Sequence, residues 1–456
     1  MKVQKLFKLV ILVLILFLIA GSGLAGELQP NESPEAVSAS VSPAANGPWF
    51  NIEVDTPGST GLYTSVTINP FNDTTYISYY DATNETLRMA MNRGFGSGNC
   101  GPDNSWLCQT VDSTKGVGKY SSIAVYPSTG EIGIAYYDAT TGKLKYAHGK
   151  ICAICSWSID TIDQPILFPT DNKGQHTSLK FDSNGKPYIA YYFEITSGVD
   201  ALMVASYVGS GGNCGYGSAA GKWQCDNIQT GEWIGQYASL ALDGSDQPRI
   251  AYYDGGNDAL MYAYQYGVSW TIREILPTNS GKYASLYVDV NNGDLPHIAH
   301  YDSSNGNLEY AVYVGSGGNC GFNNSATKFE WQCDEIEYVG TSTHPKGVSL
   351  AVDASGYPII AYQSISGSLN VAHPLAALGL PVGGGNCGPI STWYCRTIDR
   401  HSPWVPYRHG DYVSIALNQS GLATVAYFGF ITATQGNLNV SYQHFQISLP
   451  LALKNH

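Results

Sequence analysis

Charged side chains are scarce in this sequence of 456 residues, since Asp, Glu, Lys and Arg together make up only 13% of it. Seven residues are Arg, no run of Lys and Arg occurs, and the formal net charge is −13. An acidic chain without basic clusters is poorly suited to bind nucleic acid or an anionic membrane surface. We therefore expect neither as a partner.

Long apolar runs are also missing. The run over residues 9–20 is short of the ~20 residues that a membrane-spanning helix needs. It follows three Lys residues and precedes small residues at 23–25, which predicts a secretory signal peptide over residues 1–25, cleaved at that point. The alternative is an uncleaved membrane anchor. Residues 26–48 are rich in Pro, Ala, Ser and Glu and predict a flexible linker. We expect a secreted protein, either free or attached to the cell surface, with no membrane span in the mature chain.

Gly (51 residues) and Tyr (33 residues) are abundant, which favours short strands and tight turns over helices. One segment, residues 237–263 with the sequence YASLALDGSDQPRIAYYDGGNDALMYA, recurs with changes to give seven copies. Each copy holds a Ser in the same register: Ser65, Ser122, Ser178, Ser239, Ser285, Ser349 and Ser414. Successive Ser residues are 46 to 65 positions apart, a spacing that predicts a solenoid, a propeller or an array.

Each copy divides into four strand-like runs separated by turn residues, which is typical of an all-β meander. The fourth run opens with Trp in all seven cases: Trp49, Trp106, Trp157, Trp223, Trp270, Trp331 and Trp393. The first of these precedes the first Ser run, and no such run follows the last third run. In a ring, the strand at Trp49 can complete the last blade. The sequence therefore predicts a seven-bladed β-propeller of four-stranded antiparallel blades over residues 49–447, closed by the N-terminal strand. The apolar segment 447–453 is the alternative closing strand, and residues 448–456 otherwise form a tail.

Ten Cys residues form five local pairs between predicted third and fourth strands. Four pairs share an N-C-G and W-x-C frame, and the fifth is a C-x-x-C: Cys100/Cys108, Cys214/Cys225, Cys320/Cys333, Cys387/Cys395 and Cys152/Cys155. In an exported protein, an even number of Cys with repeated local pairing indicates disulfides. A zinc site at the C-x-x-C is the alternative, but it needs two more ligands and only His148 is near in sequence.

A binding site is expected where a loop departs from the repeat, because the symmetric positions are needed for packing. The loop over residues 396–412 stands out, with three of the seven Arg residues, two His and a Trp. It and Trp233 fall in loops between fourth and first strands, hence on one face. The candidate ligand-binding residues are Trp233, Arg400, His401, Trp404, Arg408, His409 and Asp411. An exposed indole flanked by polar groups suits a sugar ring. The alternative is that this loop only covers the end of the channel.

Other departures from the repeat are His176, His300 and Glu194, each of which packing can also explain. The Asp that follows the tyrosines of the second run (Asp81, Asp138, Asp254, Asp302) is expected to cap its own turn rather than to bind calcium. We expect no metal and no cofactor.

The repeat S-[LI]-A-[VL]-D-x-x-G-x-P-x-I-A-Y-Y-D, followed by G-x-L-x-Y-A, resembles repeats of secreted prokaryotic β-propeller proteins that are loosely similar to sialidases and propeller lectins. The chain lacks the S-x-D-x-G-x-T-W box of sialidases, and no arginine triad with a Tyr/Glu pair can be assembled from its seven Arg residues. The resemblance therefore implies the fold more than an activity.

Three functions remain open. The first is a non-enzymatic exported module that binds carbohydrate or another cell-surface ligand through the face carrying Trp233 and Trp404. The second is a glycan-cleaving hydrolase, which needs two carboxylates across a pocket. Its candidate carboxylates are Asp411, Glu232, Glu194 and Asp302. The third is a structural or protein-binding surface module.

Overall fold

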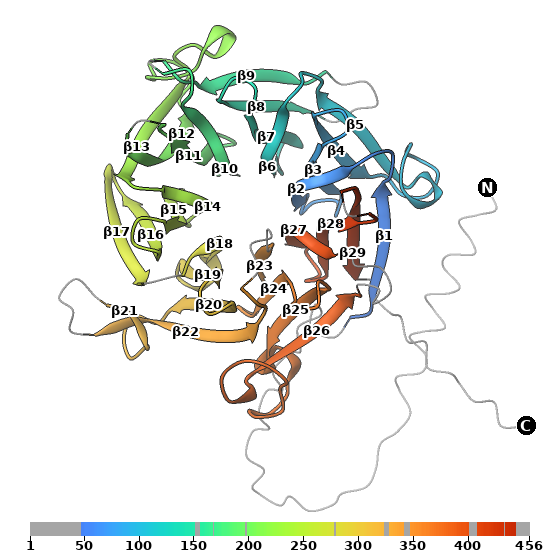
Figure 1. The fold of residues 1–456 in the computed structure, drawn as a ribbon, viewed down its shortest axis with the longest axis vertical. Coiled ribbons are helices and arrows are strands. Elements are labelled where there is room, and N and C mark those ends of the chain that lie inside the picture. The colour runs from blue at the N-terminus through green and yellow to red at the C-terminus, as the bar shows by residue number, and fades with distance from the viewer. Residues whose placement is uncertain are drawn as a thin grey trace, which may run out of the picture. The chain divides into compact units, whose positions relative to one another are not determined.

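The computed structural model describes residues 47–150, 156–166, 168–196, 198–277, 280–322, 328–341, 347–400, 408–432 and 434–443. In these residues the strands form seven antiparallel sheets around a central axis, with short 3₁₀ turns as the helical elements (Figure 1). The predicted seven-bladed propeller is confirmed. Residues 1–25 and most of 26–48 and 444–456, with the signal, linker and tail expected there, lie outside the described part.

The first four blades each contain four consecutive strands. Blade 1 is β2 (Thr60–Ile68), β3 (Thr75–Asp81), β4 (Thr86–Asn92) and β5 (Trp106–Asp112). Blade 2 is β6 (Val117–Tyr126), β7 (Glu131–Asp138), β8 (Lys143–Lys150) and β9 (Ser158–Asp163). Blade 3 is β10 (Asn172–Phe181), β11 (Pro187–Glu194), β12 (Asp200–Tyr207) and β13 (Trp223–Gly231). Blade 4 is β14 (Ile234–Leu242), β15 (Pro248–Asp254), β16 (Ala259–Tyr266) and β17 (Ser269–Leu276).

The last three blades include one extra strand and one strand from the start of the chain. Blade 5 is β18 (Lys282–Asp289), β19 (Leu295–Asp302), β20 (Asn307–Tyr313) and β22 (Phe329–Tyr338), with the short β21 (Cys320–Phe322) on its outer edge. Blade 6 is β23 (Val348–Val352), β24 (Pro358–Gln363), β25 (Leu369–Pro374) and β26 (Trp393–Asp399). Blade 7 is β27 (His409–Leu417), β28 (Ala423–Phe430), β29 (Gly436–Gln443) and β1 (Trp49–Asp55). The 3₁₀ turns are η1 (Pro102–Asn104), η2 (Gly217–Ala219), η3 (Val290–Asn292), η4 (Leu375–Leu378) and η5 (Pro389–Ser391).

The ring is closed by its N-terminal strand, as predicted. β1 runs antiparallel to β29, with Trp49 opposite Gln443 and Glu53 opposite Asn439. In Figure 1 this blue strand lies outside the red strands β28 and β29. Val54 of β1 is buried in a core that also contains Leu438 of β29 and Ile77 of blade 1. The closing strand β1 therefore contributes to a hydrophobic core shared by blade 7 and blade 1.

Each blade is buried on both faces, which explains the apolar and aromatic second strands. All seven residues of β3, with the sequence TYISYYD, are buried. The first Tyr of this motif donates its hydroxyl hydrogen to a side chain at the end of the preceding blade's fourth strand. These pairs are Tyr79–Asp55, Tyr136–Asp112, Tyr191–Asp163, Tyr252–Gln229, Tyr362–Glu337 and Tyr427–Asp399. The recurrence of Tyr and Asp in the repeat is thus a matter of joining blades.

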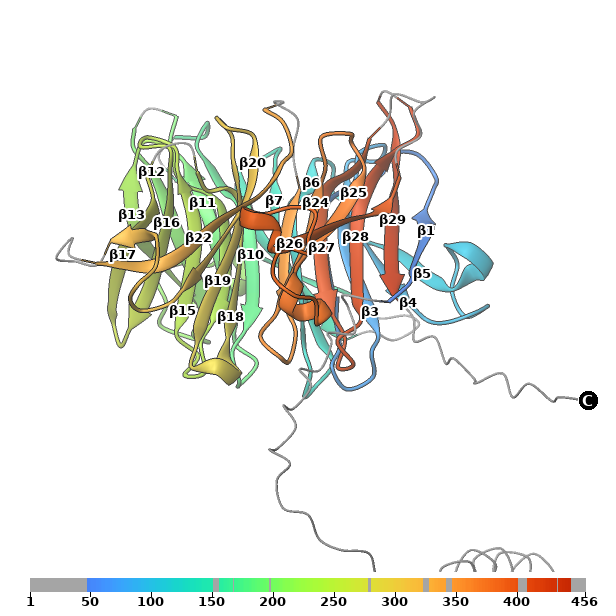
Figure 2. The same ribbon diagram turned by 90° about the horizontal axis from the view of Figure 1, so that it is seen from below.

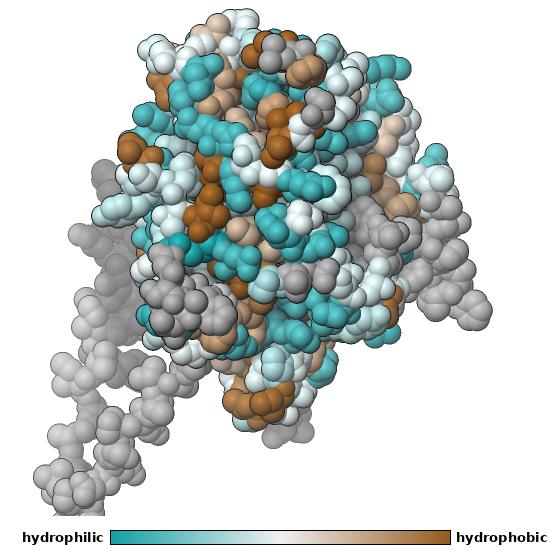
Figure 3. Space-filling view, turned by 60° about the vertical axis from the view of Figure 1, so that its left-hand side comes forward, coloured by the Kyte–Doolittle hydropathy of each residue, from teal (hydrophilic) through white to brown (hydrophobic). Residues whose placement is uncertain are grey.

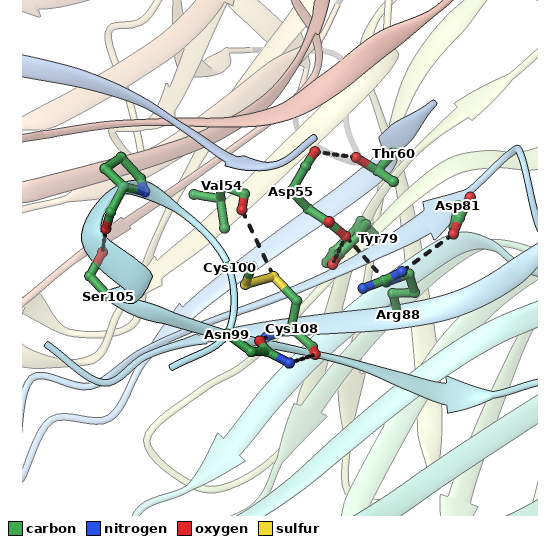
Figure 4. The surroundings of a disulfide bond; sticks show 11 residues. Val54, Asp55, Thr60, Tyr79, Asp81, Arg88, Asn99, Cys100, Ser105 and Cys108 are labelled. Carbon is green, nitrogen blue, oxygen red and sulfur yellow. Dashed lines mark hydrogen bonds and ion pairs between the residues drawn. A yellow bond between two sulfur atoms is a disulfide. The ribbon is translucent and has the colours of Figure 1, made fainter. Parts of the chain in front are cut away.

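The described Cys residues pair as predicted, in the disulfides Cys100–Cys108, Cys214–Cys225, Cys320–Cys333 and Cys387–Cys395. Cys152 and Cys155 lie outside the described residues. Figure 4 shows the blade 1 disulfide and the Asn that precedes it. The Asn99 side chain donates to Cys108 O across 3.0 Å and accepts from Cys108 N–H across 2.7 Å. Asn213, Asn319 and Asn386 do the same in the other three hairpins. The side chain of this Asn therefore forms the two hydrogen bonds that the backbone of a neighbouring strand residue would otherwise form.

Candidate functional site on the face of the fourth-to-first loops

Loops from fourth to first strands and turns from second to third strands share one face of the ring, here called the upper face. Figure 2 shows the ring from the side, with the strands running between this face and the opposite one. The opposite, lower face carries the turns between first and second strands, including η3. Trp233, Arg400 and Arg408 belong to the upper face, as expected from strand alternation.

Six aromatic side chains surround the axis near the upper face, and we call them the aromatic collar. They are Tyr63, Tyr120, His176, Tyr237, Tyr283 and Tyr412. Neighbouring rings are in contact, with centroids 4.5–4.7 Å apart from Tyr412 through to Tyr283. All six residues have a φ of 52–55°, in the left-handed region, where such residues cost roughly 1–3 kcal/mol each. Around them lies a cavity of about 180 Å³.

The left-handed conformation of the collar residues arises where the start of each first strand packs closely against the preceding blade. In blades 1 to 5 and 7, a Gly stands two residues before the collar residue and also has a positive φ. A Cβ on Gly118 would lie 2.8 Å from the backbone Cα of Leu87 in the preceding blade. The first strand therefore begins as a glycine-dependent bulge against its neighbour, and the register of β6 against β7 shifts between Lys119 and Ser122.

The collar is broken at blade 6. Gly347 occupies the collar position there, so the first strand of blade 6 contributes no aromatic side chain between Tyr283 and Tyr412 among the described residues. Blade 6 also has Gln363 where blades 1 to 5 have the second Tyr of the second strand. The Gln363 side chain is buried and donates to the carboxylate of Asp411 and to His409 O. The single irregular sector of the collar therefore adjoins the loop that the sequence analysis selected.

Burial keeps the collar uncharged. It raises the pKa of Tyr63, Tyr120 and Tyr237, and it raises the pKa of Tyr412 to about 12. Burial also lowers the pKa of His176 to about 3, so the imidazole is neutral at physiological pH. The collar thus presents aromatic surfaces and neutral hydrogen-bonding groups.

The predicted site residues of blade 7 form a bonded group at the boundary with blade 6. His409 Nδ1 lies 2.6 Å from Asp399 Oδ2, and the same oxygen accepts the Tyr427 hydroxyl across 2.5 Å. These two bonds lower the pKa of Asp399 against the opposing effect of its burial. Asp411 is only 2% exposed, and its bond to Gln363 joins the two blades.

The two Arg residues differ in their surroundings. Arg408 is half-buried, with its guanidinium over the Phe430 ring at 5.6 Å from the centroid, whereas Arg400 is exposed at the end of β26. His401 and Trp404 lie outside the described residues. Arg400 is therefore the described cation of this loop that is open to a ligand.

Trp233 is exposed by 53% and stands in the loop between blades 3 and 4. Its backbone is firmly held, because Trp233 N–H donates to Asp200 Oδ2 across 3.0 Å and Trp233 O accepts from Gly255 N–H across 3.2 Å. A Cβ on Gly255 would lie 2.7 Å from the Trp233 Cβ, so the two loops touch. Glu232, which precedes Trp233, is exposed, and so is Asn257 in the turn between β15 and β16.

Trp233 and the blade 6–7 group share the upper face but not one pocket. The first stands between blades 3 and 4, and the second between blades 6 and 7, three blades further around the ring (Figure 1). The sequence pattern predicts only that they share a face. The structure brings together Arg408, His409 and Asp411, and it places Trp233 apart from them.

The four candidate carboxylates do not converge on one pocket either. Asp302 caps its own turn by accepting from Ser304 N–H and Asn305 N–H, as Asp81, Asp138 and Asp254 do in theirs. Glu194 accepts from the side-chain amides of Asn172 and Gln175, each across 2.8 Å. Asp411 bonds Gln363, and Glu232 is exposed. Three of the four therefore already have structural partners.

One perturbed carboxyl group was missed from the sequence. Burial, followed by the charge of Asp302, raises the pKa of Glu309 to about 7. Its Oε2 lies 3.5 Å from Nε2 of the fully buried His300, whose pKa burial lowers to about 3. His300 was flagged as a departure from the repeat, but nothing in the sequence pattern pointed to its opposite residue on β20.

No helix among the described residues is long and apolar enough to cross a bilayer. On the side of the ring in Figure 3, apolar side chains form separate small patches among hydrophilic ones. Within the described residues, no group of three or more His, Cys, Asp or Glu side chains is arranged to hold a metal ion.

Comparison with known proteins agrees with the loose resemblance described above. No family model and no curated protein matches the chain. The BP39L lectin from Burkholderia pseudomallei is 14% identical, with a TM-score of 0.48 over 83% of this chain and 98% of that one. The NanB sialidase from Streptococcus pneumoniae is 9% identical, with a TM-score of 0.43 over 88% of this chain and 94% of that one. The fucose-specific lectin from Aleuria aurantia is 12% identical, with a TM-score of 0.41 over 77% of this chain and 100% of that one. At these values the likeness carries no argument about ligand or activity, and the propeller architecture rests on the strand pairing itself.

Proposed function

We propose that the protein is an exported, non-enzymatic binding module that recognises carbohydrate through its upper face. The observation that carries the proposal is Trp233. Its indole is 53% exposed although the backbone is fixed by Asp200 and Gly255. An exposed indole on a rigid support can stack on the apolar face of a sugar with little loss of side-chain entropy on binding.

The polar groups around Trp233 support the same ligand class. Glu232 precedes Trp233, and Asn257 belongs to the turn of blade 4 that touches the Trp233 loop through Gly255. Both side chains are exposed and can bond sugar hydroxyl groups. The blade 6–7 group, with Arg400 exposed, is the second candidate contact region on this face. Because it stands three blades away, a ligand that uses both regions must be an oligosaccharide or a branched glycan rather than one monosaccharide.

A glycan array probed with the mature protein tests this function. We expect binding to defined glycans, and Trp233→Ala should weaken it at least tenfold because a stacking aromatic contributes roughly 1.4 kcal/mol or more. Tyr266→Ala is the matched control, since Tyr266 is 83% exposed at the end of β16, on the lower face. This variant should bind as the unaltered protein does.

Trp404→Ala tests the second region in the same assay. If glycan binding survives both Trp substitutions unchanged, the upper face is not the binding surface. Turnover of a glycoside panel that is lost in Glu232→Gln would instead indicate the hydrolase.

A further inference from the structure

The lower half of the axis holds a cavity separate from the collar. It has a volume of about 1050 Å³ and is lined by the first strands and by the turns between first and second strands. All seven Ser residues of the repeat line it: Ser65, Ser122, Ser178, Ser239, Ser285, Ser349 and Ser414. A cavity of this size can hold a small molecule together with water.

The seven Ser hydroxyl groups form a ring of oriented donors. Each Ser Oγ accepts a backbone N–H from the next blade across 2.9–3.2 Å, from Ile123 N onto Ser65 around to Val66 N onto Ser414. Because the oxygen is used as acceptor, the hydroxyl hydrogen is the group left to face the cavity. In the described part of the chain none of these seven hydroxyls donates to a protein group. Because all seven hydroxyl groups can donate into the cavity, they favour a ligand rich in hydrogen-bond acceptors.

One cation breaks the symmetry of this cavity. Two residues after each Ser, the cavity side of the first strand holds Thr67, Ala124, Lys180, Ala241, Tyr287, Ala351 and Ala416. Lys180 is the single charged member of this set. Its side chain is exposed to the cavity, while the surrounding protein lowers its pKa by excluding bulk water. The other six members are neutral, so the packing of this register does not account for a charged side chain.

The Lys180 ammonium group has no anionic partner among the described residues. The nearest carboxylates in sequence and on the cavity wall belong to Asp182 and Asp353. Asp182 Oδ1 caps its own turn by accepting from Asn184 N–H and Lys186 N–H. Asp353 Oδ1 does the same with Ser355 N–H and Tyr357 N–H. Neither forms an ion pair with Lys180. The Lys180 ammonium group faces the cavity without an ion-pair partner within the described ranges, and a bound anion can supply one.

We propose that the axial cavity is a second binding site, which holds a small anion between the Lys180 ammonium group and the Ser ring. The chemical class is a carboxylate or an inorganic oxyanion. Lys180 and Ser178 are two residues apart on one strand, a separation of about 6.6 Å, and the flexible Lys stem brings its ammonium group within reach of the ring. A single oxyanion can therefore accept from both. This site lies on the opposite side of the collar from the proposed carbohydrate site and does not depend on it.

Bromide soaked into crystals of the protein is a direct probe of the site. Its anomalous scattering locates it, and as an anion it needs the same positively charged surroundings as the proposed ligand. We expect a bromide in contact with Lys180 Nζ in the unaltered protein and in Lys186→Met, and none there in Lys180→Met. Lys186 is the matched control because it is an exposed Lys in the same blade. A cavity without bromide in the unaltered protein overturns the proposal, and so does a bromide that persists in Lys180→Met.

Calorimetric titration with acetate and with sulfate at constant ionic strength then distinguishes the two anion sources. We expect at least tenfold weaker binding of the preferred anion to Lys180→Met, with unchanged binding in Lys186→Met and in Trp233→Ala. Equal binding to Lys180→Met contradicts the site. Loss of glycan binding in Trp233→Ala with retained anion binding shows that the two sites are separate.

Discussion

The Tyr79 hydroxyl group donates a hydrogen bond of 2.6 Å to Asp55 Oδ2, and this bond joins blade 1 to the strand that closes the ring. Arg88 Nε lies 3.2 Å from the same carboxylate oxygen (Figure 4). Tyr79 is fully buried, and Asp55 is 1% exposed. The closing strand β1, although distant in sequence from β29, therefore forms the same kind of interblade bond as five other fourth strands do.

Deleting residues 49–55 should destabilise the protein by several kcal/mol, because it exposes the core around Val54 and leaves the buried Tyr79 hydroxyl group without its acceptor. Thermal unfolding followed by circular dichroism measures the loss as a lower Tm. A deletion of residues 40–46, which leaves β1 in place, is the control and should unfold as the full chain does. An unchanged Tm after deletion of 49–55 would favour residues 447–453 as the closing strand.

At the boundary of blades 4 and 5, we expect that Leu276 and His300 together replace the acceptor and the Tyr donor of the interblade bond. By register, Leu276 holds the position of the acceptor and His300 that of the Tyr donor in the other six boundaries. Restoring both, as Leu276→Gln with His300→Tyr, should recover the bond seen between Tyr252 and Gln229. We expect a favourable coupling energy of about 0.5–1.5 kcal/mol in a double-mutant cycle measured by urea unfolding. Additive single effects would contradict the pairing.

Gly98 should tolerate no side chain. A Cβ there would lie 1.8 Å from Trp106 O, in the hairpin that the Cys100–Cys108 disulfide closes. Gly98→Ala should therefore cost about 1–3 kcal/mol, as overpacking does. Gly149→Ala in β8 is the matched control, because its Cβ would meet its nearest neighbour at 3.5 Å. Urea unfolding compares the two, and equal stabilities would show that the hairpin adjusts freely.

Glu309 should make stability fall as pH rises through the mildly acidic range. Its folded pKa of about 7 exceeds its ordinary value of 4.5, so the folded protein holds the proton while the unfolded chain releases it. The unfolding free energy should then drop between pH 4.5 and about 7, by at most ~3 kcal/mol, and level off above that. This fall in the unfolding free energy should be absent in Glu309→Gln, because Gln does not titrate.

The measurement is the difference in unfolding free energy between the unaltered protein and Glu309→Gln across this pH range. His300 is present in both, so its own opposite contribution largely cancels in the difference. A difference that does not change with pH would mean that Glu309 is ionised in the folded state.

The sequence by itself determined the architecture. Ser recurs because its hydroxyl group bonds the next blade at all seven boundaries, and Tyr recurs because its hydroxyl group does so at six of them. This repetition makes the pattern recognisable in a single sequence. The offset of Trp49 relative to the Ser runs predicted the closure, and the N-C-G and W-x-C frame predicted four disulfides that the structure confirms.

Only the tertiary structure decided what the irregular positions do. Gly347 looks like a minor change in the sequence, but it removes one aromatic ring from a collar that forms only when seven blades meet. Lys180 is one Lys among many until the first strands converge and place it alone in an axial cavity. Asp411 looked like a ligand-binding residue, yet it is buried against Gln363 of the neighbouring blade. Contacts between blades join residues far apart in the chain, and their chemistry depends on burial and neighbours that no single repeat contains.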